Sequence, residues 1–206
     1  SSASHLKPSF ANAHANTVGL KYAYETNEWI FFAHNDTCVT SSSFFEELRQ
    51  RVASGDVLIG TVTDRHPDRV DAIHISGCLV HRSLTVCVNM FPQFIDMSSN
   101  TSIPIICYET PPSSYKMVLD VGDALTLLAR QEMFQYSCMR NTYNDPTLID
   151  NLSEDFQDLF SDRALDKDGN VVFIHLGRGT ARINESYHKE GRLTLDEWLE
   201  ACKRFI

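Results

Sequence analysis

The chain has 206 residues, of which 43% are hydrophobic and 22% are charged, so it can bury a core without disulfide or metal staples. Its net charge of −9, with scattered basic residues, argues against binding to nucleic acid or anionic membranes, because both need clustered Lys and Arg. No apolar run approaches the roughly 20 residues of a transmembrane helix, and the first residues do not read as a signal peptide. The missing initiator Met indicates a processed product or a piece of a longer polypeptide.

The N-terminal part is expected to begin with a loose segment followed by strands. Residues 1–16 are polar and show no hydrophobic period, which predicts a flexible N-terminal arm. Residues 18–25 and 28–35 are rich in aromatic and β-branched side chains and flank a turn at Thr26-Asn27. This pattern predicts a β-hairpin.

A short helix and a series of strands are expected next. Ser43 and Glu46 have the spacing of a capping box, and Gly55 closes the segment, which predicts a helix between them. Residues 56–121 then contain short β-branched runs separated by turn residues. Because no long helix alternates with these runs, the pattern predicts a mainly antiparallel strand meander rather than a parallel sheet.

The last third of the chain changes to helical spacing. Residues 123–140 are good helix formers, with Asp123 as the candidate N-cap. Asp145 is the candidate cap of a second helix over Pro146–Arg163, which has proline at its first position. Residues 166–184 return to strand character around a turn, and a final helix ends the chain. The second helix carries an apolar stripe formed by Leu148, Leu152, Phe156 and Phe160.

These elements predict an α+β fold: a β-hairpin, a short helix and a mostly antiparallel strand meander, followed by a helical C-terminal third with one further hairpin. We expect one domain over residues 17–206 after the arm. A division near residue 121 into a β-rich part and a helical part is the alternative.

Residues 186–197 resemble the calcium-binding loop of an EF-hand. Gly191, the apolar Leu193 and the final Glu197 match the sixth, eighth and twelfth positions of that loop. The resemblance implies a weak calcium site with Glu190 and Glu197 as oxygen ligands.

The same stretch also has a purely structural interpretation. Ser186 and His188 stand where the EF-hand family has carboxylates. Thr194 and Glu197 have the spacing of a capping box at the start of the final helix. On this interpretation, calcium leaves the melting temperature unchanged, and Thr194→Ala removes about 1 kcal/mol of stability.

Cys38 is a candidate nucleophile. It lies just upstream of the short helix predicted from Ser43, where partial positive charge can lower the pKa of a thiol. His175 and His34 are the candidate bases. Cys38 with His175 would define a small cysteine-dependent hydrolase, although no local signature of such a family is present.

No further metal or phosphate site is predicted, and no cofactor is expected. His74, Cys78 and His81 are possible ligands by type, but on one strand His74 and Cys78 would be about 13 Å apart, and His81 would point to the other face. Gly177–Thr180 contains a glycine pair that suits a hairpin bend, because no helix starts there to bind a phosphate.

The cysteines indicate a reducing compartment. Cys78, Cys87 and Cys107 lie within apolar strand-like runs, so we expect most of the six thiols to be reduced and the protein to be cytoplasmic. A secretory location is the alternative, because the chain contains four N-x-S/T glycosylation sequons. They begin at Asn35, Asn100, Asn151 and Asn184.

The sequence carries no common catalytic signature. Together with the acidic composition and the many aromatic residues, this favours a non-enzymatic protein-interaction or assembly module within a larger polypeptide or complex. Its partner would be another protein or a second copy of the chain, without nucleic acid or membrane. The cysteine-dependent hydrolase and the weak calcium-binding module are the alternatives.

Overall fold

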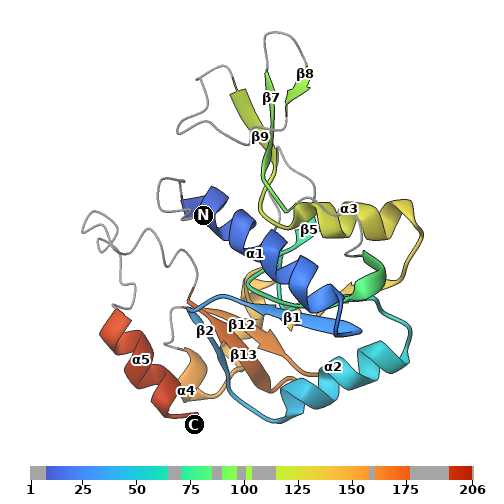
Figure 1. Cartoon of the computed structure of the whole chain (residues 1–206). Helices are drawn as coiled ribbons and strands as arrows, with labels where there is room; N and C mark the ends of the chain where they lie inside the picture. Colours follow the sequence, from blue (N-terminus) through green and yellow to red (C-terminus); the bar gives the residue numbers. More distant parts are fainter. Residues whose placement is uncertain are drawn as a thin grey trace.

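The computed structural model describes residues 8–64, 71–84, 90–96, 101–103, 115–157, 161–176 and 195–205 of the chain (Figure 1). These residues combine helices with several antiparallel sheets, which confirms the α+β class. Within the described ranges, no helix is long and apolar enough to cross a membrane.

The first element is a helix, α1 (Pro8–Tyr24). Ala13 and Leu20 lie two helical turns apart on one face, and both are buried in the core. Val18 and Tyr22 lie on the opposite face and are exposed. The predicted arm is therefore helical from Pro8 onward, and the first strand of the predicted hairpin is wrong.

Two sheets form the centre of the fold, and each contains four strands within the described residues. Neighbouring strands are antiparallel except for one parallel pair, β3 with β10. In spatial order, the first sheet consists of β1 (Trp29–Ala33), β6 (Gly77–His81), β3 (Leu58–Gly60) and β10 (Tyr136–Cys138). The second consists of β11 (Arg140–Asn141), β12 (Asp162–Leu165), β13 (Val171–His175) and β2 (Thr37–Val39).

The two sheets are joined at both edges, so their strands form a closed barrel. β1 continues into β2 through residues 34–36, and β10 continues into β11 through Met139. Backbone hydrogen bonds extend the strand pairing of each sheet into these corners: Leu176 donates to Asp36 (2.9 Å) beyond the β13–β2 pair, and Met139 donates to Gly60 (2.9 Å) beyond the β10–β3 pair. Because β6 lies between β1 and β3, the spatial order of the strands differs from that of a meander.

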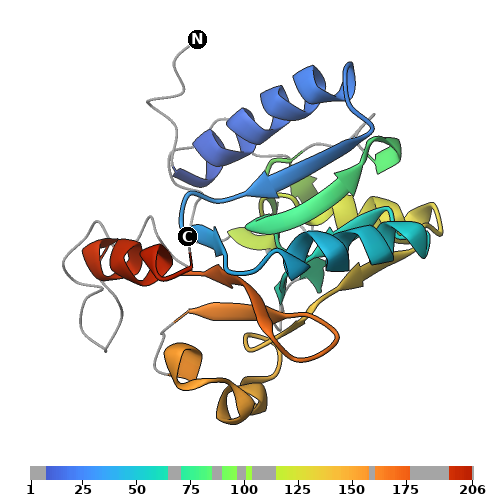
Figure 2. The ribbon, with the colours of Figure 1, turned by 90° about the horizontal axis from the view of Figure 1, so that it is seen from below.

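Apolar side chains from both sheets form an inner cluster with α2 (Ser43–Ala53). Figure 2 shows the ribbon of this helix beside the strands. In this inner cluster, Ile59 of the first sheet and Phe173 of the second lie beside Phe44 and Leu48 of the helix. The ring of Phe44 stacks on Phe173 with a centroid distance of 5.2 Å. The helix predicted after Ser43 is therefore confirmed, and its apolar face is part of the barrel core.

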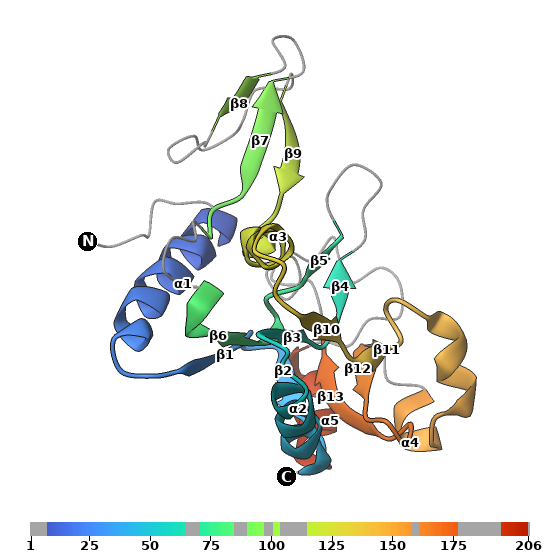
Figure 3. The ribbon, with the colours of Figure 1, turned by 90° about the vertical axis from the view of Figure 1, so that its right-hand side faces the viewer.

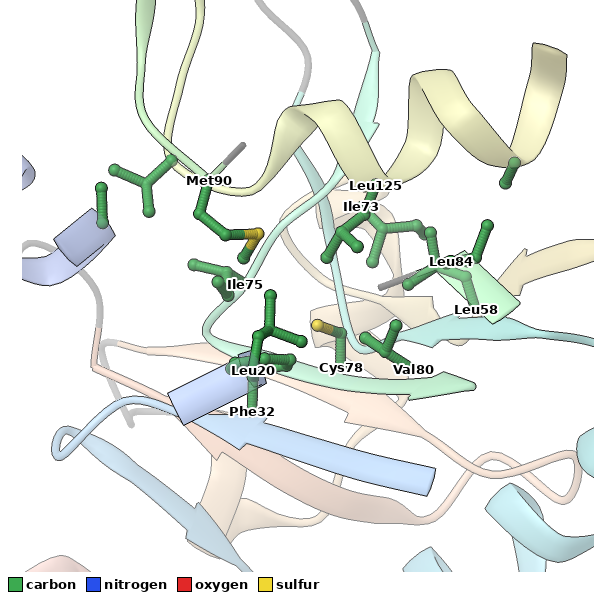
Figure 4. Packing of buried hydrophobic residues seen from close by; sticks show 13 residues of the cluster. Leu20, Phe32, Leu58, Ile73, Ile75, Cys78, Val80, Leu84, Met90 and Leu125 are labelled. Carbon is green, nitrogen blue, oxygen red and sulfur yellow. The ribbon is translucent and has the colours of Figure 1, made fainter. Parts of the chain in front are cut away.

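Helices also cover the outer faces of the sheets. α1 and α3 (Asp123–Gln131) pack on the first sheet, where Leu20 and Leu125 lie in the same cluster as Val80 (Figure 4). α5 (Leu195–Lys203) confirms the final helix and packs on the second sheet through Trp198. α3 ends before the predicted limit at residue 140, because residues 136–138 pair with β3 instead.

The predicted helix over Pro146–Arg163 is divided into shorter elements, because residues 162–165 pair with β13. η2 (Pro146–Asn151) is a 3-10 helix and α4 (Glu154–Gln157) is a single α-helical turn. Asp145 caps η2 as predicted, since its carboxylate accepts a hydrogen bond from the amide of Thr147 (3.2 Å). From the predicted stripe, Leu148, Leu152 and Phe156 pack on the outer cluster of the second sheet, whereas Phe160 lies outside the described residues.

A separate small sheet projects from this body (Figures 1 and 3). Its described strands, in spatial order, are β8 (Thr101–Ile103), β7 (Gln93–Asp96) and β9 (Tyr115–Leu119). The remaining described elements are the paired strands β4 (Thr63–Asp64) and β5 (Ala72–Ile73) and the 3-10 turn η1 (Arg82–Leu84).

The hairpin between β12 and β13, which the sequence predicted, is held by the carboxylate of Asp166. Its Oδ1 accepts hydrogen bonds from the amides of Asp168 (3.0 Å) and Asn170 (2.9 Å). Its Oδ2 accepts one from the hydroxyl of Ser43 (3.2 Å) at the start of α2, so Ser43 does not form the predicted capping box. Burial raises the pKa of Asp166, but these hydrogen bonds, with those of Asn170 the strongest, outweigh it and lower the pKa overall.

We expect Asp166→Ala to lower the free energy of unfolding by about 1–3 kcal/mol at pH 7, the usual effect of leaving buried donors unpaired. Because the folded pKa lies below the unfolded value of about 3.9, this stabilisation is present above the unfolded pKa and is lost as the pH falls through the folded pKa. Urea unfolding at several pH values measures both effects. Asp168→Ala, at an exposed position of the same turn, is the matched control and should change stability little at any pH.

Candidate metal centre

Three histidines and two aspartates come together at the corner where β1 turns into β2. His34 and Asp36 lie in this corner, His74 follows β5, and His175 is the last residue of β13. The three histidine rings have centroid distances of 5.6 to 5.8 Å in all three pairings. Asp162, the first residue of β12, lies opposite His175 in the strand register.

Backbone hydrogen bonds and strand pairing determine the positions of His34 and His175. The amide of His34 donates a hydrogen bond to the carbonyl of Ser76 (3.1 Å), which fixes the corner against the start of β6. His175 lies on the same face of β13 as Phe173, because alternate residues of a strand share a face. Since Phe173 belongs to the inner cluster, the ring of His175 points into the barrel.

Asp36 lies between two of the histidines. Its Oδ1 is 3.6 Å from Nε2 of His175 and 3.9 Å from Nδ1 of His34. One ligand atom from each of these three residues lies within 4.8 Å of the others. Asp36 and His175 are buried and His34 is half-buried. A buried carboxylate in this position requires a positive partner, which a bound metal ion can supply.

His34 does not supply that positive charge at neutral pH. Burial, followed by the neighbouring His175, lowers the pKa of His34, and together they outweigh the opposite effects of Asp36 and Asp120. Within the described structure, Nε2 of His34 is buried without a hydrogen-bond partner. The neutral imidazole is the form that binds a metal ion, and Nδ1, the nitrogen 3.9 Å from Oδ1 of Asp36, is the candidate ligand atom.

Asp162 lies near the ring nitrogen of His175 that does not face Asp36. Its Oδ2 lies 3.3 Å from Nδ1 of His175, within ion-pair distance, although Nδ1 does not meet the angular requirements of a hydrogen bond in the described structure. A histidine that donates one N–H to a carboxylate and presents its other nitrogen to an ion is the usual arrangement in metal sites.

His74 has a different role, because its Nδ1 already accepts a hydrogen bond. The amide of Ser76 donates to it (3.1 Å), so in the neutral ring the proton is on Nε2. Burial, followed by His175 and His34, lowers the pKa of His74 to about 4. His74 is therefore a neutral hydrogen-bond donor beside the centre rather than one of its ligands.

The contact between His74 and Ser76 does not form a catalytic dyad. The hydroxyl of Ser76 lies 2.8 Å from Nδ1 of His74, but the same His-x-Ser turn occurs at His81 and Ser83, with a corresponding distance of 2.9 Å. In both turns the serine amide donates to the same nitrogen. The repeated geometry identifies a local turn, and Ser76 is fully buried.

The structure does not bring Cys38 and His175 together as a nucleophile and its base. Cys38 lies opposite Ile174 in the register, whereas His175 lies opposite Thr37. Opposite residues of antiparallel strands share a face, so Cys38 and His175 point to different faces of the sheet. Cys38 packs in the outer cluster with Ile174. His34, the other candidate base, belongs to the metal centre.

The other residues singled out from the sequence lie apart from this centre. Cys78 is buried in the outer cluster of the first sheet, and His81 packs edge-on against Trp29. Glu197 is exposed in the first turn of α5. Glu190, Thr194 and Gly177–Thr180 lie outside the described residues, so the calcium loop and its capping-box alternative stay predictions.

The described cysteines form no disulfide. Cys38, Cys78, Cys138 and Cys202 carry no disulfide, whereas Cys87 and Cys107 lie outside the described residues. The expectation of mostly reduced cysteines stays a prediction for the whole chain. Mass spectrometry after alkylation without reductant tests it, and three intact bridges would contradict it.

No protein-family model matches the chain, and no curated protein or solved structure is detectably similar to it. The assignment of the candidate metal centre therefore depends on the geometry of its side chains alone. The sequence analysis missed Asp36 and Asp162. The local signal was the His34-Asn35-Asp36 spacing at a turn between two strand-like segments, but the third ligand, His175, is distant in sequence.

Proposed function

We propose that this protein binds one zinc ion through His34, Asp36 and His175, with Asp162 orienting His175. The observation that supports the proposal is the convergence of two imidazoles and one carboxylate whose ligand atoms lie within 4.8 Å of one another. Asp36 and Asp162 add negative charge at the same point, which a divalent cation would balance.

The ligand types and spacings favour zinc. At metal–ligand distances of about 2.0–2.1 Å, tetrahedral geometry separates ligand atoms by about 3.3 Å, whereas octahedral neighbours are about 3.0 Å apart. The separations of 3.6 and 3.9 Å from Oδ1 of Asp36 are closer to the tetrahedral value than to the octahedral one. Calcium and magnesium prefer oxygen ligands and do not suit two imidazoles.

Three protein ligands leave one tetrahedral position open, which is the pattern of catalytic rather than structural zinc sites. A water molecule in that position would have its pKa lowered to about 7, and the neutral ring of His74 lies beside both histidine ligands. The proposed role of the ion is therefore hydrolytic catalysis with zinc-bound water as the nucleophile.

Ferrous iron is the second candidate, because two histidines and one carboxylate also form the facial ligand set of non-haem iron enzymes. Binding of zinc and the visible spectrum of the cobalt(II)-substituted protein distinguish the two ions. A protein that binds zinc tightly and gives a tetrahedral visible spectrum with cobalt(II) supports the proposal, whereas a six-coordinate cobalt(II) spectrum favours iron.

The test is a calorimetric titration of the chelator-treated full chain with zinc, beside manganese, magnesium and calcium. We expect one zinc site per chain that is lost in Asp36→Asn, since the amide cannot supply the anionic oxygen. Circular dichroism of the variant checks that the loss does not come from unfolding. The absence of saturable zinc binding, or binding that survives in a folded Asp36→Asn, would contradict the proposal.

Asp162→Asn should weaken zinc binding by about 10- to 100-fold without abolishing it, because the loss of a carboxylate behind a ligating histidine typically has this effect. Competition with a fluorescent chelator measures the change. Asp168→Asn is the matched control, since Asp168 lies in the same hairpin but at its exposed turn, and its zinc affinity should stay at the wild-type value. If both substitutions weakened zinc binding equally, the cause would be the loss of one negative charge anywhere in the hairpin rather than the position of Asp162 behind His175.

The protein-interaction module stays a prediction. Exposed apolar side chains that such a module could use are present on the described surface, but nothing observed identifies a partner for them. The most exposed are Met133, Tyr22, Phe45 and Val18.

A further inference from the structure

Two cysteines meet where α5 packs on the second sheet. Cys38 of β2 lies opposite Ile174, so its side chain is on the outer face of that sheet. Cys202 of α5 is buried in the cluster that contains Ile174, and Cys38 packs against the same cluster. Besides burial, the neighbouring Cys38 contributes to the raised pKa of Cys202, and neither thiol forms a disulfide.

The other described pair of cysteines provides a contrast. Cys78 and Cys138 also share a cluster, but they lie on strands β6 and β10, on either side of Gly60. Two strand spacings separate their Cα atoms by about 9.6 Å, beyond the limit of about 7 Å for a disulfide. Cys78 and Cys138 are therefore too far apart to form a disulfide, whereas Cys38 and Cys202 share one cluster across the contact of α5 with β2.

We propose that Cys38 and Cys202 form an oxidisable dithiol that closes to an intramolecular disulfide, with a small-molecule disulfide such as glutathione disulfide as the oxidant. Cys38 is more exposed and attacks first: its sulfur bonds to one glutathione sulfur, and the other glutathione leaves as a thiolate. Cys202 then attacks the Cys38 sulfur and releases the second glutathione. The protein loses two electrons, and its two thiol protons end on two molecules of glutathione.

The resting state of the pair is the dithiol. Burial, followed by the neighbouring Cys38, raises the pKa of Cys202 to about 12, so Cys202 carries its proton at neutral pH. The bridge would attach α5 covalently to β2, the strand that begins directly after Asp36. This inference is independent of the zinc proposal, since neither thiol belongs to the proposed ligand set.

The experiment oxidises the full chain with glutathione disulfide in the presence of EDTA, so that no bound metal affects the result. The non-reduced protein is then digested and its linked peptides are identified by mass spectrometry. We expect one major linkage, Cys38 to Cys202, and a rise in melting temperature of several degrees that dithiothreitol reverses. Such a rise follows because the bridge restricts the unfolded chain over a long loop.

Cys38→Ser and Cys202→Ser should each prevent this linkage, and Cys78→Ser, the matched control, should leave it unchanged. The peptide map of the wild-type protein decides the question even if a variant does not fold. A linkage through any other cysteine, a disulfide between two chains, or glutathione retained on Cys38 without closure would overturn the proposal. None of these results bears on zinc binding.

Discussion

Replacing His175 by alanine should abolish the stabilisation of the protein by zinc. An ion that binds only the folded state stabilises it by RT ln(1 + [L]/Kd), which is about 2.7 kcal/mol at a concentration 100 times Kd. In the proposed site His175 is one of two imidazole ligands, and its ring lies within 3.6 Å of both Asp36 and Asp162. Urea unfolding with zinc and with EDTA measures the increment, which should fall close to zero in His175→Ala.

The control for this experiment is His81→Ala. His81 is a half-buried histidine in the same type of His-x-Ser turn as His74, and it lies at the opposite end of β6 from the centre. The comparison uses the zinc increment of each variant, because removal of a packed ring changes the stability of the metal-free protein as well. An increment that persists in His175→Ala but disappears in His81→Ala would place the ion elsewhere and contradict the proposed ligand set.

The sequence predicts several local elements correctly, although the capping box at Ser43 is not formed. The helix after Ser43, the hairpin around Gly169 and the cap at Asp145 are all found. It fails for residues 18–24, where Val18, Leu20 and Tyr22 alternate with polar or small residues as in a strand but lie in α1. The helix is stabilised by packing of Ala13 and Leu20 on the first sheet, a tertiary effect that outweighs local propensity.

Only part of the candidate site could be predicted from the sequence, namely its two histidines. His34 and His175 were both considered, but as bases for Cys38, because no residue pattern shows that β2 lies beside β13. The pairing arises from closure of the barrel, which brings together segments far apart in the chain. The pairing register of β2 with β13 determines the face on which each side chain lies. In this register Cys38 and His175 lie on opposite faces of the sheet. Long-range pairing therefore determines the chemistry here more than local sequence does.

Replacing Phe173 by alanine should cause the largest loss of stability, about 3–5 kcal/mol, as is typical for a buried phenylalanine. Phe173 is 2% exposed and lies in the inner cluster between the two sheets. Its ring stacks on Phe44 and lies edge-on to Phe31 at 6.4 Å. Urea unfolding measures the loss. Phe45→Ala is the control, since that ring is 62% exposed and its removal should change stability by less than about 1 kcal/mol.

A double-mutant cycle with Gly77 tests whether Phe173 fills the barrel in the way described. A Cβ at Gly77 would lie 2.7 Å from Cζ of Phe173 and 2.7 Å from the hydroxyl of Thr61, so Gly77→Ala alone should cost about 1–3 kcal/mol through overpacking. In the Phe173→Ala background the aromatic clash is gone, and the added methyl group partly fills the new cavity. Gly77→Ala should then cost at least 1 kcal/mol less than in the wild type, a coupling that only residues in contact show. Simple additivity of the two substitutions would mean that the β6 and β13 side chains do not meet inside the barrel, and would contradict the closed arrangement of the two sheets.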